Sequence, residues 1–147
     1  HPEGLFRMTA HIAVTEDLAS CHLLRRIVFI EEQNVSEADE MDDRDDDATH
    51  FLATEEELPI GSARMHIKGD TAKIGRVCVI KSHRGTGLGA ALIRAAVDEA
   101  RKDPAVRFVK LGAQLHALGF YEKLGFVAQG PVFDDAGIDH REMVLSL

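Results

Sequence analysis

The residues with the clearest chemical potential form a glycine-rich turn between an apolar segment and an amphipathic one. Gly85, Gly87 and Gly89 alternate along this turn, and glycine lets backbone come close to a ligand because it has no Cβ. The first amides of a following helix lack partners within the helix and lie at the positive end of its dipole. Arg84 adds a forked cation beside them. The turn therefore predicts a site for a diphosphate group that needs no metal.

Three other interpretations of the turn compete with this one. A Walker-type loop requires Lys and then Ser or Thr after the last glycine, and Ala90-Ala91 supplies neither. Gly85-x-Gly87-x-x-Ala90 satisfies the dinucleotide-binding fingerprint, so an NAD-type oxidoreductase stays open. The next strand of such a unit should end in an acid that binds ribose, whereas this one ends in Leu111-Gly112-Ala113-Gln114. Glycines that only shape the turn are the remaining alternative.

The elements that must position the turn follow from hydrophobic periodicity and turn residues. Three strands joined by short connections precede the turn, so we expect them to be antiparallel neighbours. The helix after the turn is a crossover, which predicts that the next strand lies parallel to the strand ending at Ile80. We expect strands at 9–14, 50–54, 60–67, 71–80, 106–111, 126–133 and 140–147, and helices at 18–28, 87–102 and 115–124. The fold class is therefore α/β (α+β), with a mixed, mostly antiparallel sheet of six to seven strands flanked by helices.

Length and composition fit one soluble domain over residues 1–147, with residues 1–8 as an extension, native or left over from expression. The net charge of −8 argues against a nucleic-acid binder. Cys21 and Cys78 lie far apart and in unlike surroundings, so no disulfide or paired-cysteine zinc site is indicated. The apolar runs are too short for a signal peptide or a membrane span. We expect a cytoplasmic protein with no membrane partner.

An acidic stretch from Asn34 to Asp47 predicts a loop with at most a short helical turn. Asp43-x-Asp45-x-Asp47 imitates the start of a calcium loop, but Ala48 and Thr54 stand where that loop needs glycine and a bidentate glutamate. The stretch is interpreted as a solvated face. The alternative is that its negative charge attracts a cationic acceptor substrate. The histidines show no zincin spacing, so no metal is expected.

Two motifs in order give the chain a family resemblance. Arg84-x-x-Gly87-x-Gly89 after an apolar strand resembles the pyrophosphate loop of the GNAT superfamily of acyl-CoA-dependent N-acyltransferases. Ala117-Leu118-Gly119-Phe120-Tyr121-Glu122-Lys123-Leu124-Gly125-Phe126 is similar to the second signature of that family. Residues 28–33 and the acidic stretch further resemble small bacterial members of the ElaA kind. The resemblance covers essentially the whole chain from Ala10 onward.

The resemblance implies an acetyltransferase that uses acetyl-CoA, with coenzyme A in a gap between the strands ending at Ile80 and Gln114. A primary amine of a small molecule or peptide would attack the thioester directly. Tyr121 would be catalytic, with its hydroxyl near the departing sulfur. The coenzyme would contact backbone and side chains of Val77, Cys78, Val79, Arg84, Gly85, Thr86, Gly87, Leu88, Gly89, Ala90 and Gln114. As a side chain, Cys78 is expected to be a packed thiol and not a nucleophile.

Other parts of the site are less determined by the resemblance. Many family members carry Asn where this chain has Gln114, so the amide contact there is a point of departure. Glu31, Glu32 and His50 are the candidates for contacting the acceptor or taking its proton. A non-catalytic acyl-CoA sensor on the same fold stays an alternative. A homodimer is a candidate assembly.

Overall fold

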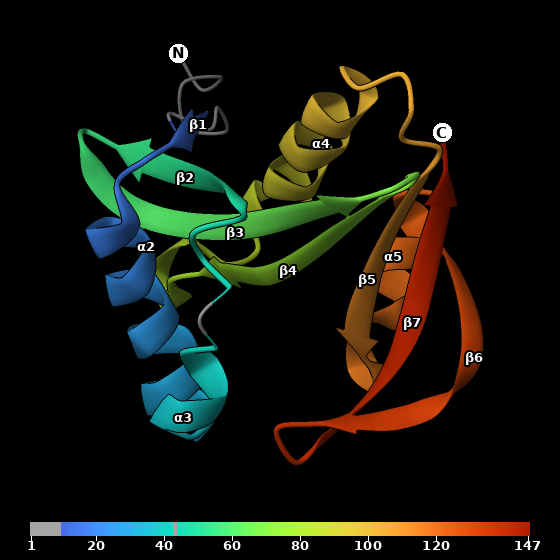
Figure 1. Ribbon diagram of the computed structural model, residues 1–147. Helices are drawn as coiled ribbons and strands as arrows, with labels where there is room; N and C mark the ends of the chain where they lie inside the picture. Colours follow the sequence, from blue (N-terminus) through green and yellow to red (C-terminus); the bar gives the residue numbers. More distant parts are fainter. Residues whose placement is uncertain (1–9, 43) are drawn as a thin grey trace.

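A seven-stranded sheet forms the body of the protein in the computed structural model, which describes residues 10–42 and 44–147 (Figure 1). The order across the sheet is β1-β2-β3-β4-β5-β7-β6. Neighbours are antiparallel except β4 and β5, which are parallel. The strands are β1 (His11–Thr15), β2 (Thr49–Glu55), β3 (Leu58–Lys68), β4 (Thr71–Val79), β5 (Phe108–Gln114), β6 (Val127–Asp135) and β7 (Ile138–Ser146). The expected mixed, mostly antiparallel sheet is confirmed.

Two hairpins are tighter than the sequence predicts. The connection between β2 and β3 is reduced to Glu56 and Glu57, with φ of 50° and 69°. The connection between β6 and β7 is reduced to Ala136 and Gly137, with φ of 54° and 82°. Consecutive positive φ values match the twist of two-residue hairpins. The polar residues 134–139 were expected to form a loop, but strand pairing continues through most of them because these turns need only two residues.

Helices cover both faces of the sheet, in the predicted order. They are α2 (Leu18–Arg25), which continues as the π-helical segment η1 (Arg26–Glu32), then α3 (Glu37–Glu40), α4 (Leu88–Arg101) and α5 (Leu118–Lys123). Short 3-10 turns, η2 (Lys81–His83) and η3 (Leu115–Ala117), precede the last two helices. Asp17 caps α2 by accepting from the Ser20 amide. No helix in the described part of the chain is long and apolar enough to cross a membrane.

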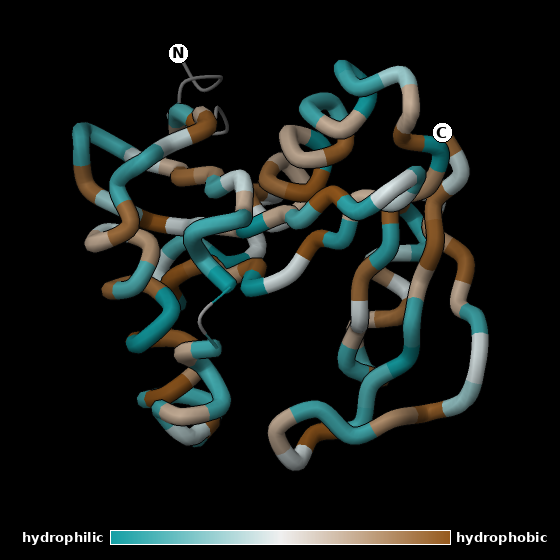
Figure 2. Tube along the Cα trace, in the orientation of Figure 1, coloured by the Kyte–Doolittle hydropathy of each residue, from teal (hydrophilic) through white to brown (hydrophobic). Residues whose placement is uncertain are grey.

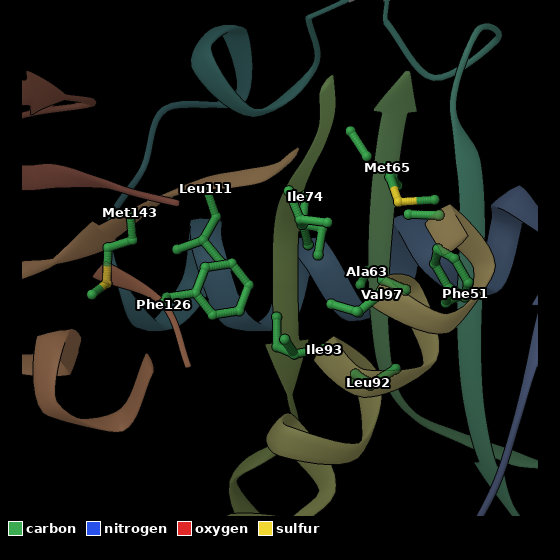
Figure 3. Close-up of a cluster of buried hydrophobic side chains, with 14 of the residues drawn as sticks. Phe51, Ala63, Met65, Ile74, Leu92, Ile93, Val97, Leu111, Phe126 and Met143 are labelled. Carbon is green, nitrogen blue, oxygen red and sulfur yellow. The ribbon is translucent and has the colours of Figure 1, made fainter. Parts of the chain in front are cut away.

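The main core lies between α4 and the sheet. Figure 3 shows Leu92, Ile93 and Val97 of α4 next to side chains of the central strands, with α2 on the other side of the sheet. This core continues under both halves of the sheet, since Leu111 of β5 and Phe126 belong to it as well. Figure 2 shows brown and tan segments along α4 and the central strands, and teal segments where residues 44–47 lead into β2.

A second buried cluster lies under α2 and holds both cysteines. Cys21 and Cys78 pack there with Leu24, Val28 and Leu52. The expectation that the two cysteines have unlike surroundings is therefore wrong; the fold brings them into one cluster, as free thiols. Burial raises the pKa of each thiol to about 11. Both stay protonated at neutral pH and act as small apolar side chains.

The one parallel pairing of the sheet is short. β4 and β5 pair only from Thr71–Lys73 to Phe108–Lys110, after which the strands diverge (Figure 1). The remaining residues of β4 pair with β3 on one side only, and those of β5 pair with β7 on one side only. The divergence opens the centre of the sheet, and the glycine turn follows directly from the open end of β4.

Candidate active site

A cavity of about 530 Å³ lies where β4 and β5 diverge. Its walls come from β3, β4, the end of β5, the segment from η1 to the acidic stretch, the segment from η3 to α5, and the β6–β7 hairpin. Residues that line it include Phe29, Gln33, Gly75, Arg76, Val77, Gly112, Gln114, Tyr121, Phe133 and His140. A ligand that entered the gap would therefore meet residues from both halves of the sheet.

The edge of β4 that faces the gap carries unpaired backbone groups. The Ile80 amide donates to the Ile60 carbonyl of β3 at 3.0 Å. Because polar groups alternate along a strand, those of Val79 point away from β3 and toward the gap. Val77 lines the cavity, whereas the side chain of Cys78 is buried and its Sγ lies 3.3 Å from Ser62 Oγ. Val77 and the Val79 amide are thus positioned to pair with an extended ligand, whereas the Val79 carbonyl already accepts from Arg84 Nε.

The glycine turn has the backbone geometry that the sequence predicts. Gly85 and Gly87 have φ of 79° and 86°, values that favour glycine. Thr86 Oγ1 donates to the His83 carbonyl at 2.6 Å and closes the turn. No side chain caps α4, so the amides of Leu88, Gly89 and Ala90 at its start have no partner within the helix. Free amides in this arrangement, just beyond the open end of β4, favour an anion, so the predicted diphosphate site stays a prediction.

Arg84 lies beside this anion site but is already engaged. Its Nε donates to the Val79 carbonyl at 3.0 Å, and its guanidinium forms an ion pair with Glu32 of η1. Both side chains are partly exposed. Glu32 therefore neighbours the predicted diphosphate site and is absent from the cavity wall. Its role toward an acceptor stays a prediction.

The other two acceptor candidates are also absent from the cavity wall. Glu31 is exposed at the end of η1. His50 is 5% exposed, and its Nε2 lies 2.8 Å from the Asp45 carbonyl oxygen, so the ring is held against the acidic stretch. The structure does not bring Glu31, Glu32 and His50 together at the cavity.

Tyr121 reaches the cavity from α5. Its ring packs edge-on against Phe120 and Phe126, with centroid separations of 5.0 and 6.1 Å. Burial raises the pKa of its phenol, because an apolar environment disfavours the phenolate. The hydroxyl therefore keeps its proton at neutral pH and can donate a hydrogen bond.

Gln114 ends β5 with an oriented amide. Its Nε2 donates to Gln33 Oε1 of the segment after η1 at 3.2 Å, across the cavity. Its Oε1 lies 2.8 Å from His116 Nε2, which must then carry a proton. The longer amide that replaces the family's Asn thus links the two sides of the cavity.

Three arginines hold part of the acidic stretch, so its interpretation as a solvated face is wrong for Glu40, Asp42 and Asp45. The other acidic residues described there, Glu37, Asp39, Asp46 and Asp47, are exposed. Glu40 is 3% exposed, and its Oε2 lies 2.9 Å from Arg25 Nε and 2.8 Å from Arg76 Nε. Arg25 also reaches Asp45 Oδ1 at 2.7 Å. The carboxylates of Glu40 and Asp45 are therefore neutralised by the guanidinium groups of Arg25 and Arg76. Carboxylates on a solvated loop would not need such partners.

The third arginine of this network, Arg64, holds Asp42 and Asp45. It forms a two-point ion pair with Asp42 and lies 3.0 Å from Asp45 Oδ1. Arg76 approaches Asp42 from β4 at 3.2 Å. Arg76 stands in the β4 bulge with φ of 52°, an uncommon conformation for a residue with a side chain. At the bulge, the Arg76 side chain of β4 reaches the acidic stretch.

We expect acid to destabilise the fold through this network. Hydrogen bonds from Arg64 hold the pKa of Asp42 below its usual 3.8. Partial burial alone raises the pKa of Asp45, but hydrogen bonds from Arg25 and His22 outweigh burial and hold it below 3.8 as well. Carboxylates with lowered pKa contribute stability that is complete above the unfolded pKa and is lost as pH falls toward the folded pKa. Melting temperatures should be flat near neutral pH and fall below about pH 4.

Thermal melts across this pH range test the expectation, with Asp42→Asn as the control. The variant should be less stable at neutral pH and should lose less stability on acidification than the parent. Equal slopes in the two proteins would show that Asp42 is not a source of the acid sensitivity.

Sequence reasoning missed Arg25 and the contribution of the predicted β6–β7 pair to the cavity wall. A signal for Arg25 was present, since it lies four residues after Cys21 and three before Val28, on the apolar stripe of its helix. Phe133 and His140 had no comparable signal. They reach the cavity because they pair with each other and His140 pairs with Gln114 at the open end of β5. Their rings stack with centroids 5.8 Å apart.

Comparison with known proteins agrees with this geometry. A family model described as "Acetyltransferase (GNAT) domain" matches residues 25–147. The chain is 37% identical over 139 residues to the "Uncharacterized N-acetyltransferase YjcF" of Bacillus subtilis, covering 93% of this chain and 99% of that one. It is 32% identical over 124 residues to protein ElaA of Escherichia coli, covering 82% and 81%.

Solved structures share the arrangement of strands and helices. The crystal structure of Escherichia coli ElaA superposes with a TM-score of 0.80 at 26% identity, covering 92% of this chain and 97% of that one. A Bacillus subtilis acetyltransferase crystallised in complex with CoA superposes with a TM-score of 0.72 at 19% identity, covering 94% and 99%. The second likeness concerns the fold alone.

Proposed function

The chain belongs to the GNAT acetyltransferase family, and from that premise we propose that it transfers an acetyl group from acetyl-CoA to a primary amine of a small molecule or peptide. It is an acyltransferase of the N-acetyltransferase type. The observation that carries the proposal is the gap between β4 and β5, which leads directly to the uncapped start of α4. An extended arm ending in a diphosphate fits such a continuous path.

The proposed donor is held mainly by backbone. The diphosphate would accept from the amides of Gly85 to Ala90, where the helix dipole favours negative charge. The pantetheine arm would pair with Val77 and Val79 as an added strand does. Arg84 would release Glu32 or share its guanidinium with the ligand. A relative in fold crystallised with CoA adds support for this class of donor.

The chemistry proposed is a direct attack of the amine on the thioester carbonyl. Binding both substrates in one cavity makes the reaction effectively unimolecular, which supplies much of the acceleration. Tyr121 would stabilise the departing sulfur by donating its hydroxyl proton or a hydrogen bond. No covalent enzyme intermediate is required.

Thermal shifts and thiol release test this proposal in two stages. Acetyl-CoA at about 100 times its Kd should add about 2.7 kcal/mol to the stability of the folded state. NAD at the same concentration is the matched competitor, and stabilisation by NAD alone would overturn the choice of donor. Thiol release is then followed with polyamines, amino acids, aminoglycosides and peptide N-termini. If acetyl-CoA stabilises the protein but no class of amine causes thiol release, the proposal that the protein is a catalyst is contradicted.

The anion site gives a sharp prediction at Gly87. Its φ is 86°, and no neighbouring atom lies within 4 Å of the point where a Cβ would stand, so the Cβ of a valine there meets conformational strain and no clash. Left-handed backbone costs a residue with Cβ about 1–2 kcal/mol. If that strain displaces the turn, the Kd for acetyl-CoA should rise about 5- to 30-fold in calorimetry, since 1.4 kcal/mol corresponds to a factor of ten.

Gly69→Val is the matched control for Gly87→Val. Gly69 has φ of 62°, also has open space around it, and forms the β3–β4 turn at the end of the sheet where β4 and β5 still pair. The Gly69→Val variant should lose about as much stability as Gly87→Val and should keep the wild-type affinity for acetyl-CoA. Equal affinities in the two variants would remove the turn from the donor site.

A further inference from the structure

His140 is a buried histidine on the cavity wall that the proposed chemistry has not yet used. It lies on β7, is 9% exposed, and lines the cavity. The strand register places it directly opposite Gln114 of β5 and Phe133 of β6. Residues paired in this way project from the same face, with Cβ atoms about 5 Å apart. The imidazole therefore stands beside the amide at the open end of β5.

Two contacts fix the orientation of this ring. Nδ1 lies 2.7 Å from the Ile138 carbonyl oxygen, which can only accept, so the proton of the neutral ring is on Nδ1. Phe133 stacks on the imidazole with an interplanar angle of 26°. Phe133 is in turn close to β5, because a Cβ on Gly112 would stand 3.1 Å from its ring. The neutral ring therefore presents a lone pair on Nε2.

That lone pair is accessible from the cavity. Among the described residues, none forms a hydrogen bond with Nε2, and no buried side-chain nitrogen or oxygen lacks a partner. An Nε2 atom without a partner must then be reached by solvent, and His140 is one of the residues that line the cavity. An oriented imidazole with a free Nε2 has the geometry of a proton acceptor.

Other basic groups on the wall are engaged or solvated. Glu40 and Asp42 are paired with arginines. His66 and His116 donate from Nε2 to the Arg44 carbonyl and to Gln114 Oε1, so their lone pairs lie on Nδ1. The ring of His66 is half-buried and that of His116 is exposed, unlike that of His140. Asp39 and Asp135 are exposed to water. His140 is thus the buried group of the described cavity wall that keeps a free lone pair.

We propose that His140 is the general base that prepares the acceptor amine, an inference that rests on the proposed acetyl transfer. The substrate ammonium gives one proton to Nε2, and the freed amine attacks the thioester carbonyl carbon. The C–N bond forms and the C–S bond breaks with its electron pair moving to sulfur. The second proton of the nitrogen reaches the sulfur, directly or through Tyr121, to give amide and CoA thiol. The imidazolium returns its proton to water.

A donor analogue tests the position of Nε2 without any acceptor. Bromoacetyl-CoA carries an electrophilic carbon next to the thioester, and Nε2 should displace its bromide to form an N–C bond. Peptide mass spectrometry should find the adduct on His140, and His140→Asn should lack it. Asparagine is chosen because its amide keeps a donor toward the Ile138 carbonyl and removes Nε2. An adduct on another residue, or none, would overturn the proposal.

Kinetics test the role of His140 with the amine that the wild-type enzyme acetylates best. His140→Asn should lower kcat by about 100-fold, the lower range for a lost general base, with the KM for acetyl-CoA and the melting temperature nearly unchanged. Imidazole added to His140→Ala should restore part of the rate, which a purely structural role would not allow. His11→Asn is the control, since His11 lies exposed on β1 and is absent from the cavity wall; it should match the wild type.

The two proposals fail in different ways. If acetyl-CoA neither stabilises the wild-type protein nor releases thiol with any amine, the acetyl transfer itself is wrong. If the wild type is active and His140→Asn keeps more than about a third of its turnover, or if imidazole gives no rescue, only the role of His140 is wrong.

Discussion

Arg25→Ala should destabilise the protein by about 3–5 kcal/mol, the range for removing one partner of a buried ion pair. Arg25 is 1% exposed and bonds Glu40 and Asp45 together. Its loss leaves Glu40 with Arg76 alone and weakens the hold on Asp45, with little water available to solvate the carboxylates. Since small domains are stable by about 5–15 kcal/mol, the effect should be large in urea denaturation.

The neighbouring residue provides a matched control for Arg25. Arg26 also forms an ion pair, with Glu37 at 3.0 Å, but these side chains are 46% and 62% exposed. Exposed pairs contribute about 0–1 kcal/mol, so Arg26→Ala should stay within that range. If the two variants lose similar stability, the buried network does not support the fold as described.

Tyr121→Phe should lower kcat by about 100-fold while acetyl-CoA affinity stays within a factor of about two. The change removes only the hydroxyl, and the ring keeps its edge-on contacts with Phe120 and Phe126. Proton donors and preorganised hydrogen bonds in a transition state are worth about 10²–10³ in rate. Burial keeps the phenol protonated. The hydroxyl is therefore expected to speed the step in which the C–S bond breaks and negative charge reaches the sulfur.

Two measurements separate this role from a packing role. Calorimetry with CoA and thermal melts should give nearly equal values for Tyr121→Phe and the parent, while single-turnover thiol release should be slower. Tyr121 is the only tyrosine of the chain, so no second phenol can substitute for it. Unchanged turnover would remove Tyr121 from the mechanism.

The order of elements was predictable because each leaves a local pattern. The stripe from Leu88 to Ala100 and the apolar strands around it specify the crossover unit. Strand ends were less predictable, because hairpin turns such as Ala136-Gly137 depend on φ values that polar composition alone does not reveal. The π-helical segment η1 leaves no recognisable pattern and was predicted as ordinary helix.

The donor half of the candidate site was more predictable than the acceptor half. An anion site at a helix start is local, so Gly85, Gly87 and the amides after them are visible in the sequence. The cavity wall, where the acceptor is proposed to bind, is built from residues far apart in the chain, such as Phe29, Arg76 and His140. Tertiary packing decides which carboxylate of the acidic stretch pairs with which arginine. The sequence carries no local pattern for these pairs, so sequence reasoning described the stretch as solvated.

The short pairing of β4 with β5 also bears on how the empty enzyme avoids self-association. Divergence after Lys73 and Lys110 creates two open strand edges in the middle of the sheet, and open edges are templates for aggregation. Here each edge is shielded by the other half of the sheet, and the bulge at Arg76 interrupts a regular ladder. The opening proposed to admit a donor is thus short and irregular, which makes it a poor template for the strand pairing that leads to fibrils.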